Sequence, residues 1–482
     1  MAGSDRLASY ARAYLLRADP DVDELVVDAF VRSDDFGRLI GVFDIQLGRY
    51  LKRYKALQGM PDPSPAPVAD GELVFRLRNA RAGEPYLEVL APQLAPGQAL
   101  RYLEITLPPG TGLLAEPATG TIAGTPLKLG EIEIGILYQL TGEPPAVRLR
   151  GALRLVVNAD PKTLWKNLPS AREERYWKAD EECASVAGPN FRMLAASKRG
   201  RSHAHAGSFR DDDFRIGAVA LSGWHVAVVS DGAGSARYSR RGSQLICEEA
   251  MQHLDQVLGG EAGGVIEQAA QAYVALRAGT DAVATEAARQ VLHYKLYETV
   301  GHAAYFGVKA IAREIAGHPD AQAAVKDFAS TALIAACKRM PFGTLFAAYW
   351  VGDGAVAVYT RGKGVTLLGE ADSGEFSGQT RFLDAAEVTQ EALVRRTRFA
   401  IVDDATALIL MSDGVSDPRF DTEAQLARLP PWDALWDELE RAVDLSGAGQ
   451  DKQQRLLSWL DFWSPGNHDD RTIAIIYPET RA

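Results

Sequence analysis

Two Asp-Gly pairs, each placed directly after an apolar run, constrain the fold of this chain more than any other feature. The runs and their pairs are residues 224–230 followed by Asp231-Gly232, and residues 407–412 followed by Asp413-Gly414. Near the C-terminus, Asp469-Asp470 stands just ahead of a further apolar run at 473–477. Short apolar runs bounded by turn residues are typical of buried strands. Because strands are stiff, carboxylates at their ends can be held close together, and hard divalent cations relieve the resulting repulsion. The pattern therefore predicts a sheet protein with a divalent-cation site.

The composition of the chain limits which binding partners and which cellular compartment we expect. The chain has 482 residues, enough for two or three domains, and a formal net charge of −11. That charge disfavours nucleic acid and anionic membrane as main partners. The cysteines Cys183, Cys247 and Cys337 lack any metal-ligand spacing and predict buried, reduced thiols. The N-terminus has no apolar leader, and no run reaches the ~18 apolar residues of a membrane span. We therefore expect a cytoplasmic protein.

The N-terminal part of the chain divides into two segments joined by a linker. Residues 1–60 place apolar side chains at mixed three- and four-residue spacings, which predicts a helical segment. In residues 60–67 proline alternates with other residues, which excludes a helix and marks the linker. Residues 68–158 change to short alternating runs separated by turn residues, as in a β-sandwich.

Residues 68–158 also carry a motif. It consists of Leu107-Pro108-Pro109-Gly110 followed by TGTIAGTP at 119–126, and it resembles the bacterial putative-immunoglobulin repeat. The resemblance implies an immunoglobulin-like all-β domain, in which glycines supply positive-φ turns and Leu and Ile side chains fill the core. Such domains bind or space other modules, and we assign this one no chemistry.

The remaining residues, 185–482, combine strand-like and helical patterns. An alanine-rich block at 243–326 predicts several helices that cover a sheet. Acidic residues recur at the expected strand ends. They are Asp211, Asp212, Asp213, Asp231, Asp353, Asp413, Asp417, Asp469 and Asp470. A single Asp-Gly pair is more often a plain turn than a ligand. Five acidic sites in this order favour metal chemistry, with Asp as a short, rigid oxygen ligand and Gly allowing a sharp turn.

The acidic sites lie in or near motifs that resemble those of the type 2C, metal-dependent protein phosphatases, in particular their bacterial branch. The motifs are at 231–243 (DGAGSARYSRRGS), 329–332 (ASTA), 374–383 (GEFSGQTRFL) and 469–472 (DDRT). The resemblance covers roughly residues 190–480. It implies an α+β fold whose catalytic domain is an antiparallel β-sandwich flanked by helices. It also implies hydrolysis of phosphoserine and phosphothreonine on proteins.

The resemblance further implies a role for each acidic position. The implied metal ligands are Asp211, Asp212, Asp231, Gly232, Asp353, Asp413, Asp417 and Asp469. Asp231 would bridge two Mn²⁺ or Mg²⁺ ions, with help from the Gly232 carbonyl at the second ion. Asp413 and Asp469 would complete the first ion.

The remaining implied ligands serve the second ion and a weaker third. Asp211 and Asp212 would hold water on the second ion. Asp353 and Asp417 would share a third ion with Asp413. A water bridging the first two ions would lose a proton near neutral pH and attack phosphorus, which makes a phosphoenzyme unnecessary.

The chain departs from the family at the phosphate-binding arginine. Many members have an arginine about five residues before the acidic pair, where this chain has Gly207. Arg199, Arg201 and Arg210 lie close enough in sequence to replace it, and the planar guanidinium fork suits phosphate. For each of them a solvated loop role is an equally good interpretation.

A second departure concerns the proton donor. Many members have a histidine shortly after the first Asp-Gly pair, where this chain has Ala233. His203 or His205 could donate the proton instead, although a solvated loop role is again an alternative. The residues to which we assign catalysis are Asp212, Asp231, Arg210 and His203.

Three functions stay open at this point. The favoured one is a phosphatase acting on phosphorylated proteins, whose N-terminal module docks a partner such as a Ser/Thr kinase. A pseudophosphatase scaffold would explain the missing histidine and displaced arginine, but a scaffold has no reason to gather aspartates. A metallohydrolase of nucleotides or small phosphoesters is the third. Metal-dependent turnover and a substrate panel separate them.

Overall fold

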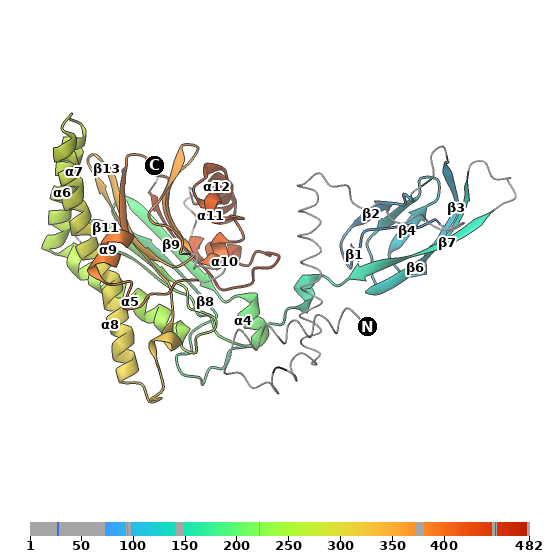
Figure 1. Ribbon diagram of the computed structural model, residues 1–482, viewed down its shortest axis with the longest axis horizontal. Coiled ribbons are helices and arrows are strands. Elements are labelled where there is room, and N and C mark those ends of the chain that lie inside the picture. Colours follow the sequence, from blue (N-terminus) through green and yellow to red (C-terminus); the bar gives the residue numbers. More distant parts are fainter. Residues whose placement is uncertain are drawn as a thin grey trace. The chain divides into compact units, whose positions relative to one another are not determined.

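The computed structural model describes residues 73–92, 98–140, 148–220, 222–372, 380–445 and 451–479, together with Val27, Leu94 and Gly449. The chain divides into two compact units, Met1–Ala159 and Asp160–Ala482 (Figure 1). The helical segment predicted at 1–60 lies outside the described residues, apart from Val27. The second unit begins at Asp160, ahead of the phosphatase boundary predicted at 185.

The described part of the first unit consists of strands in two sheets, with the orders β1-β7-β6-β3 and β2-β5-β4. The strands are β1 Ala80–Arg81, β2 Tyr86–Val89, β3 Leu100–Thr106, β4 Leu113–Glu116, β5 Thr121–Gly124, β6 Gly130–Leu140 and β7 Leu149–Asn158. One apolar cluster takes buried side chains from both sheets, among them Ile122 and Ile134. Gly110 and Gly120 lie in turns and have positive φ, as predicted for the motif, whereas Gly124 has positive φ at the end of strand β5.

The second unit contains two larger antiparallel sheets, with the orders β10-β11-β12-β13-β16 and β15-β14-β17-β18-β9-β8. The strands are β8 Glu181–Ala187, β9 Phe191–Lys198, β10 Asp213–Ala218, β11 Trp224–Ser230, β12 Ala332–Met340, β13 Gly343–Val351, β14 Ala355–Thr360, β15 Gly364–Leu367, β16 Thr397–Val402, β17 Ala407–Met411 and β18 Arg471–Pro478. Successive side chains of a strand point to opposite faces. Ala227 and Val229 of β11 therefore join the core shared with the second sheet, while Val226 and Val228 join the cluster under the helices.

Helices cover the outer faces of both sheets. The larger ones are α5 Ser239–Gly259, α6 Glu261–Arg277, α7 Ala282–Leu296, α8 His302–Ala316, α12 Leu429–Val443 and α13 Lys452–Trp459. The shorter ones are α4 Arg201–Ala206, α9 Gln390–Arg396, α10 Asp413–Ser416 and α11 Glu423–Leu426. In Figure 1 the strands lie between α5–α8 on one side and α10–α12 on the other. The alanine-rich block at 243–326 thus forms helices over a sheet, as predicted, and the unit has a mixed α+β fold.

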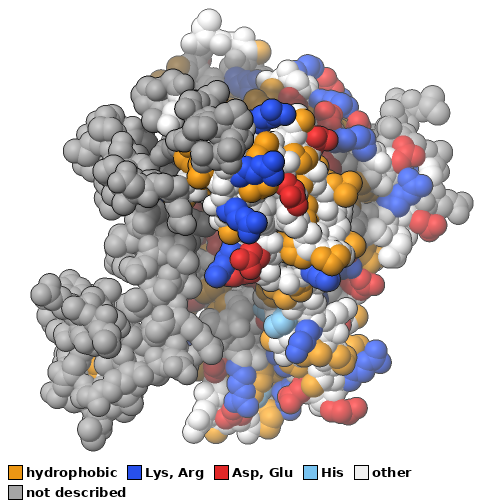
Figure 2. Space-filling model, turned by 90° about the vertical axis from the view of Figure 1, so that its right-hand side faces the viewer, with side chains coloured by type: hydrophobic (Ala, Val, Ile, Leu, Met, Phe, Trp, Pro, Cys, Tyr) orange, Lys and Arg blue, Asp and Glu red, His pale blue; other side chains and the backbone are white. Residues whose placement is uncertain are grey.

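Two observations concern the prediction that neither nucleic acid nor membrane is a main partner: the distribution of charged side chains and the character of the helices. On the face of the molecule in Figure 2, basic and acidic side chains are interspersed with apolar ones. Within the described ranges, no helix is both long and apolar enough to cross a membrane.

Candidate metal centre

Strand register brings the predicted acidic segments to one edge of the sheets. Ser230, the last residue of β11, pairs with Asp213, the first residue of β10. Met411, the last residue of β17, pairs with Ile473 of β18. Each pair adjoins predicted acidic residues within a few positions along the chain. The first register places Asp231 next to the 211–213 segment, and the second places Asp413 next to Asp469 and Asp470.

The two Asp-Gly pairs need glycine for a different reason from the sharp turn predicted. A Cβ on Gly414 would lie 1.9 Å from the carbonyl oxygen of Asp470, and a Cβ on Gly232 would lie 2.6 Å from that of Asp211. Neither glycine has a positive φ. Each is required because a second acidic segment packs against its backbone, which also brings the carboxylates close.

Asp231, Asp353 and Asp413 form the first acidic cluster. Each offers a carboxylate oxygen, and these oxygens lie within 4.8 Å of one another. One oxygen of Asp353 and one of Asp413 are buried without a hydrogen-bond partner. Burial, and then the neighbouring carboxylates, raise the pKa of Asp231 and Asp413 well above the usual range. Because buried polar atoms are normally satisfied, these orphaned oxygens fit a hard divalent cation, which takes oxygen ligands.

Two further residues adjoin this cluster. The N–H of Asp417 donates to the carbonyl oxygen of Asp413 at 2.9 Å. Burial, and then Asp353, raise the pKa of Asp417 to about 6. Thr380 donates a hydrogen bond to the Asp353 carboxylate. Asp353 and Asp417, predicted to share an ion with Asp413, are therefore both close to it.

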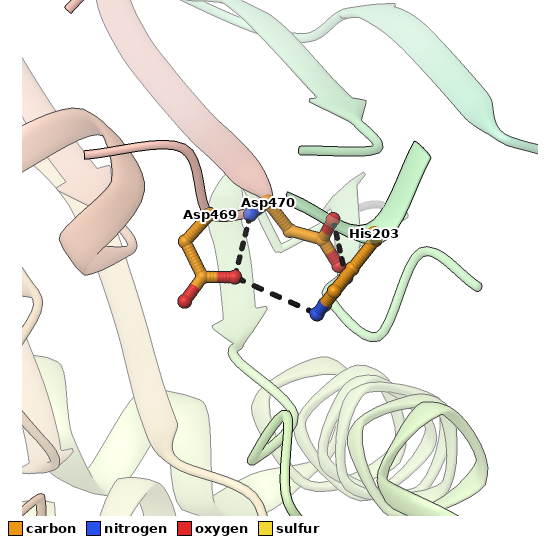
Figure 3. Close-up of side chains that lie close together, drawn as sticks. All are labelled: His203, Asp469 and Asp470. Carbon is orange, nitrogen blue, oxygen red and sulfur yellow. Dashed lines mark hydrogen bonds and ion pairs between the residues drawn. The ribbon is translucent and has the colours of Figure 1, made fainter. Parts of the chain in front are cut away.

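His203, Asp469 and Asp470 form a second cluster (Figure 3). The Nδ1 atom of His203, on α4, lies 3.0 Å from an oxygen of Asp470. Its Nε2 atom lies 3.9 Å from an oxygen of Asp469 and 4.0 Å from one of Asp211. Burial lowers the pKa of His203, but the nearby carboxylates, Asp470 first, outweigh burial and raise it to about 10.

Asp470 is a buried carboxylate whose structural role the sequence did not indicate. Its oxygens accept hydrogen bonds from the backbone N–H groups of Gly200 at 2.6 Å, Asp211 at 2.5 Å and Asp212 at 3.3 Å. Burial raises its pKa, but His203 and these donors bring the net shift below the usual Asp value. Asp470 therefore ties α4 to the segment that carries Asp211 and Asp212.

The acidic triplet 211–213 divides in two. Asp213 pairs with Lys178 at 3.0 Å and with Arg215 at 2.8 Å. One oxygen of Asp212 accepts a hydrogen bond from Thr472 at 2.7 Å, and the other is buried without a partner. Burial, and then Asp470, raise the pKa of both Asp211 and Asp212 to about 7. Asp213 is therefore paired with cationic side chains, whereas the negative charges of Asp211 and Asp212 are not fully balanced by neighbouring cations.

Arg210 does not turn toward the acidic clusters, contrary to its predicted role. Its side chain is fully buried, and it donates to the carbonyl oxygens of Ala179 and Asp212, each at 3.0 Å, and to Glu182 at 2.9 Å. A guanidinium committed to protein acceptors has little left for a phosphate. The geometry gives no support to phosphate binding by Arg210.

The other two arginine candidates are also occupied. Arg199 donates to the carbonyl oxygens of Ser208 and Leu168. Arg201 donates to the carbonyl oxygens of Asp461 and Phe462.

The two histidine candidates differ in position. His205 is exposed, and its Nδ1 atom accepts a hydrogen bond from the N–H of Lys166 at 3.1 Å. His203 alone lies between the carboxylates. Its ring also reaches the loop after the first Asp-Gly pair, because a Cβ on Gly234 would lie 3.4 Å from Nε2. No local pattern distinguished the two histidines, since the partners of His203 are far away in sequence.

Comparison with known proteins adds an independent finding. The family model described as Protein phosphatase 2C matches residues 199–461. A comparison with curated proteins gave no match.

Solved structures of low identity are also similar to this chain. The catalytic domain of the serine threonine protein phosphatase PstP, in complex with two manganese ions, is 17% identical, with 60% of this chain and 98% of that chain covered and a TM-score of 0.35. RsbX in complex with magnesium is 12% identical, with 62% and 100% covered and a TM-score of 0.31. Stp1 from Staphylococcus aureus is 12% identical, with 64% and 99% covered and a TM-score of 0.32.

Proposed function

The chain belongs to the protein phosphatase 2C family, and on that premise we propose that it hydrolyses phosphoserine and phosphothreonine on proteins with Mn²⁺ or Mg²⁺ ions. The observation that carries the proposal is the half-buried cluster of Asp231, Asp353 and Asp413, whose oxygens lie within 4.8 Å of one another. Unsatisfied carboxylates at this spacing fit divalent cations.

The proposed ligands are Asp211, Asp212, Asp231, Gly232, Asp353, Asp413, Asp417 and Asp469. Asp231 would serve two ions, Asp413 and Asp469 the first of them, and Asp211 and Asp212 the second through water. Bound ions supply a hydroxide from water near neutral pH and offset the charge of the phosphate. Asp231 and Asp413 follow the buried strands β11 and β17, which fix where their backbones lie.

His203 is the proposed proton donor. Asp470 holds Nδ1 at 3.0 Å and so orients the ring, with Nε2 toward Asp211 and Asp469. Because Nδ1 is engaged with Asp470, Nε2 is the ring nitrogen left to carry the donated proton. That proton would go to the serine or threonine oxygen as the phosphate leaves.

The test is hydrolysis of a phosphothreonine peptide by metal-stripped protein with Mn²⁺ or Mg²⁺ added back. We expect metal-dependent turnover that the Asp231→Asn variant loses. Asp437→Asn is the matched control. Asp437 lies on α12, is half-exposed and forms an ion pair with Arg361. Folded wild-type protein without activity under either metal would instead favour the pseudophosphatase scaffold. Faster turnover of nucleotides or small phosphoesters than of phosphopeptides would favour the third function.

The first unit is proposed as an immunoglobulin-like module that docks the phosphoprotein substrate or a cognate kinase. Leu87 and Leu114 stand opposite Ala123 in its three-stranded sheet, and both leucines are largely exposed. A full-length Leu87→Glu/Leu114→Glu variant should keep its peptide phosphatase activity and lose partner binding. Unchanged binding would contradict a docking role for this face.

The compartment is a further proposal. Cys183, Cys247 and Cys337 are all free thiols, and unpaired cysteines suit a reducing compartment. We therefore propose a cytoplasmic signalling role, which localisation of the tagged chain in cells would test.

A further inference from the structure

One segment of the second unit runs along the acidic centre without belonging to either sheet. Residues 165–180, here called the strap, lie between the short helix Pro161–Leu164 and strand β8. The strap precedes residues 199–461, which match the family model.

Three buried arginines of the second unit hold the strap by its backbone. The hydrogen bonds run from Arg199 to Leu168 O (2.9 Å), from Arg210 to Ala179 O (3.0 Å), and from Arg240 to Arg175 O (2.7 Å) and Tyr176 O (3.1 Å). A buried guanidinium is costly unless it has acceptors. The strap is therefore part of the folded unit rather than a loose connection.

The strap in turn holds the acidic triplet through Lys178. The Nζ atom of Lys178 donates to the carbonyl oxygen of Asp212 at 2.6 Å, to the carboxylate of Asp213 at 3.0 Å and to the hydroxyl of Ser243 at 3.5 Å. The side chain is only 12% exposed. Three acceptors match the three N–H donors of an ammonium group. Ser243 links Lys178 to Asp211 as well, since the Ser243 hydroxyl donates to the carbonyl oxygen of Asp211 at 2.5 Å.

These contacts fix Asp212 from two sides. Lys178 fixes its backbone, and Thr472 fixes one carboxylate oxygen at 2.7 Å. The second carboxylate oxygen is buried and has no partner. With backbone and first oxygen both held, the direction of the second oxygen is set. This is the arrangement by which outer-shell groups orient metal ligands.

We propose that Lys178 is a positioning residue for the acidic centre and acts through Asp212. The inference rests on the proposed function, in which Asp212 serves a metal ion. A purely electrostatic influence has the opposite sign, because a buried ammonium repels a cation and its removal would tighten cation binding. The direction of the change in affinity therefore distinguishes positioning from charge.

The experiment measures Mn²⁺ binding to the full chain by calorimetry, together with the unfolding midpoint and the kinetics on a phosphothreonine peptide. We expect Lys178→Met to weaken Mn²⁺ binding about tenfold and to leave KM for the peptide unchanged. Lys338→Met is the matched control, because Lys338 is also largely buried and paired with a carboxylate, Glu267. That control should bind Mn²⁺ like the wild type.

A double variant separates positioning from general destabilisation. Lys178→Met/Asp213→Asn removes both members of the buried pair, so its unfolding midpoint should return toward the wild type while Mn²⁺ binding stays weak. Equal or tighter Mn²⁺ binding by Lys178→Met would overturn the inference alone. Recovery of both midpoint and affinity in the double variant would also overturn it. A wild-type protein that binds no Mn²⁺ would overturn the proposed function, and the inference with it.

Discussion

The acidic centre holds two kinds of buried carboxylate, and their difference separates scaffold from candidate ligand. Asp213 and Asp470 are surrounded by cationic or N–H donors, which outweigh burial and lower their pKa values. Asp231 and Asp413 are half-buried and face other carboxylates, and their pKa values are raised. Burial of an aspartate therefore does not by itself indicate a ligand. Burial without donors does, because such a group lacks its countercharge until a cation arrives.

The strongest test of this contrast is Asp413→Asn. We expect a loss on the order of a thousandfold in kcat/KM on a phosphothreonine peptide, since a carboxylate of the proposed metal site is removed. The metal-free variant should be more stable than the wild type by about 1 kcal/mol, because repulsion among carboxylates is relieved. Urea unfolding with and without Mn²⁺ measures both effects. A variant that is less stable without metal would place Asp413 with the scaffold group.

The converse substitution, Asp470→Asn, addresses the other group. The amide cannot replace all the acceptors that Gly200, Asp211 and His203 use. We expect the free energy of unfolding to fall by about 3 kcal/mol even without metal. Urea unfolding of the metal-free protein is the measurement. Unchanged stability would contradict the division into structural carboxylates and candidate ligands, since Asp470 would then behave like Asp413.

A smaller effect is expected at His203, which joins the two groups. His203→Gln should lower kcat on the phosphothreonine peptide about a hundredfold, because the leaving oxygen loses its proton donor. With p-nitrophenyl phosphate, whose leaving group needs no proton, the loss should be slight. Steady-state kinetics on both substrates gives the ratio. Equal losses on both would show that His203 acts by position or charge rather than by proton transfer.

The smallest expected effect lies outside the centre, at His225 on β11. This side chain is fully buried with both ring nitrogens unpartnered, and burial lowers its pKa from 6.5. The unfolded state therefore binds more protons, so the contribution to stability is complete above about pH 6.5 and is lost as the pH falls. Between pH 7 and pH 5 the wild type should lose more stability than His225→Gln. Urea unfolding of both proteins between pH 5 and pH 7 measures this difference in stability. If the two proteins lost stability equally as the pH fell, protonation of His225 would not contribute.

The sequence predicted the parts of the centre that depend on local pattern. Asp231 and Asp413 each follow an apolar strand, and packing of the two sheets against each other brings their carboxylates within 4.8 Å. The alanine-rich block became helices for the same reason, since its apolar spacing is visible along the chain. The domain boundaries at 1–60, 68–158 and 185–482 and the ligand roles of the aspartates stay predictions.

Contacts between distant segments were not predictable in this way. Arg210 is close in sequence to the acidic triplet, yet its guanidinium reaches Ala179 and Glu182 of another segment. His203 and His205 are equivalent in local pattern, and only the packing of α4 against Asp470 separates them. Lys178 gave no signal at all, because its partners belong to strand β10 and helix α5.

The strap has a practical consequence for anyone who wishes to produce the second unit alone. A fragment that starts at residue 185, or at the family match at 199, would remove Lys178 and the carbonyl groups that Arg210 and Arg240 use. In such a fragment the guanidinium groups of Arg210 and Arg240 would lose hydrogen-bond acceptors. Poor expression or weak activity of the fragment would therefore say nothing about the intact chain. Fragments that begin at Asp160, where the compact unit starts, keep every one of these contacts.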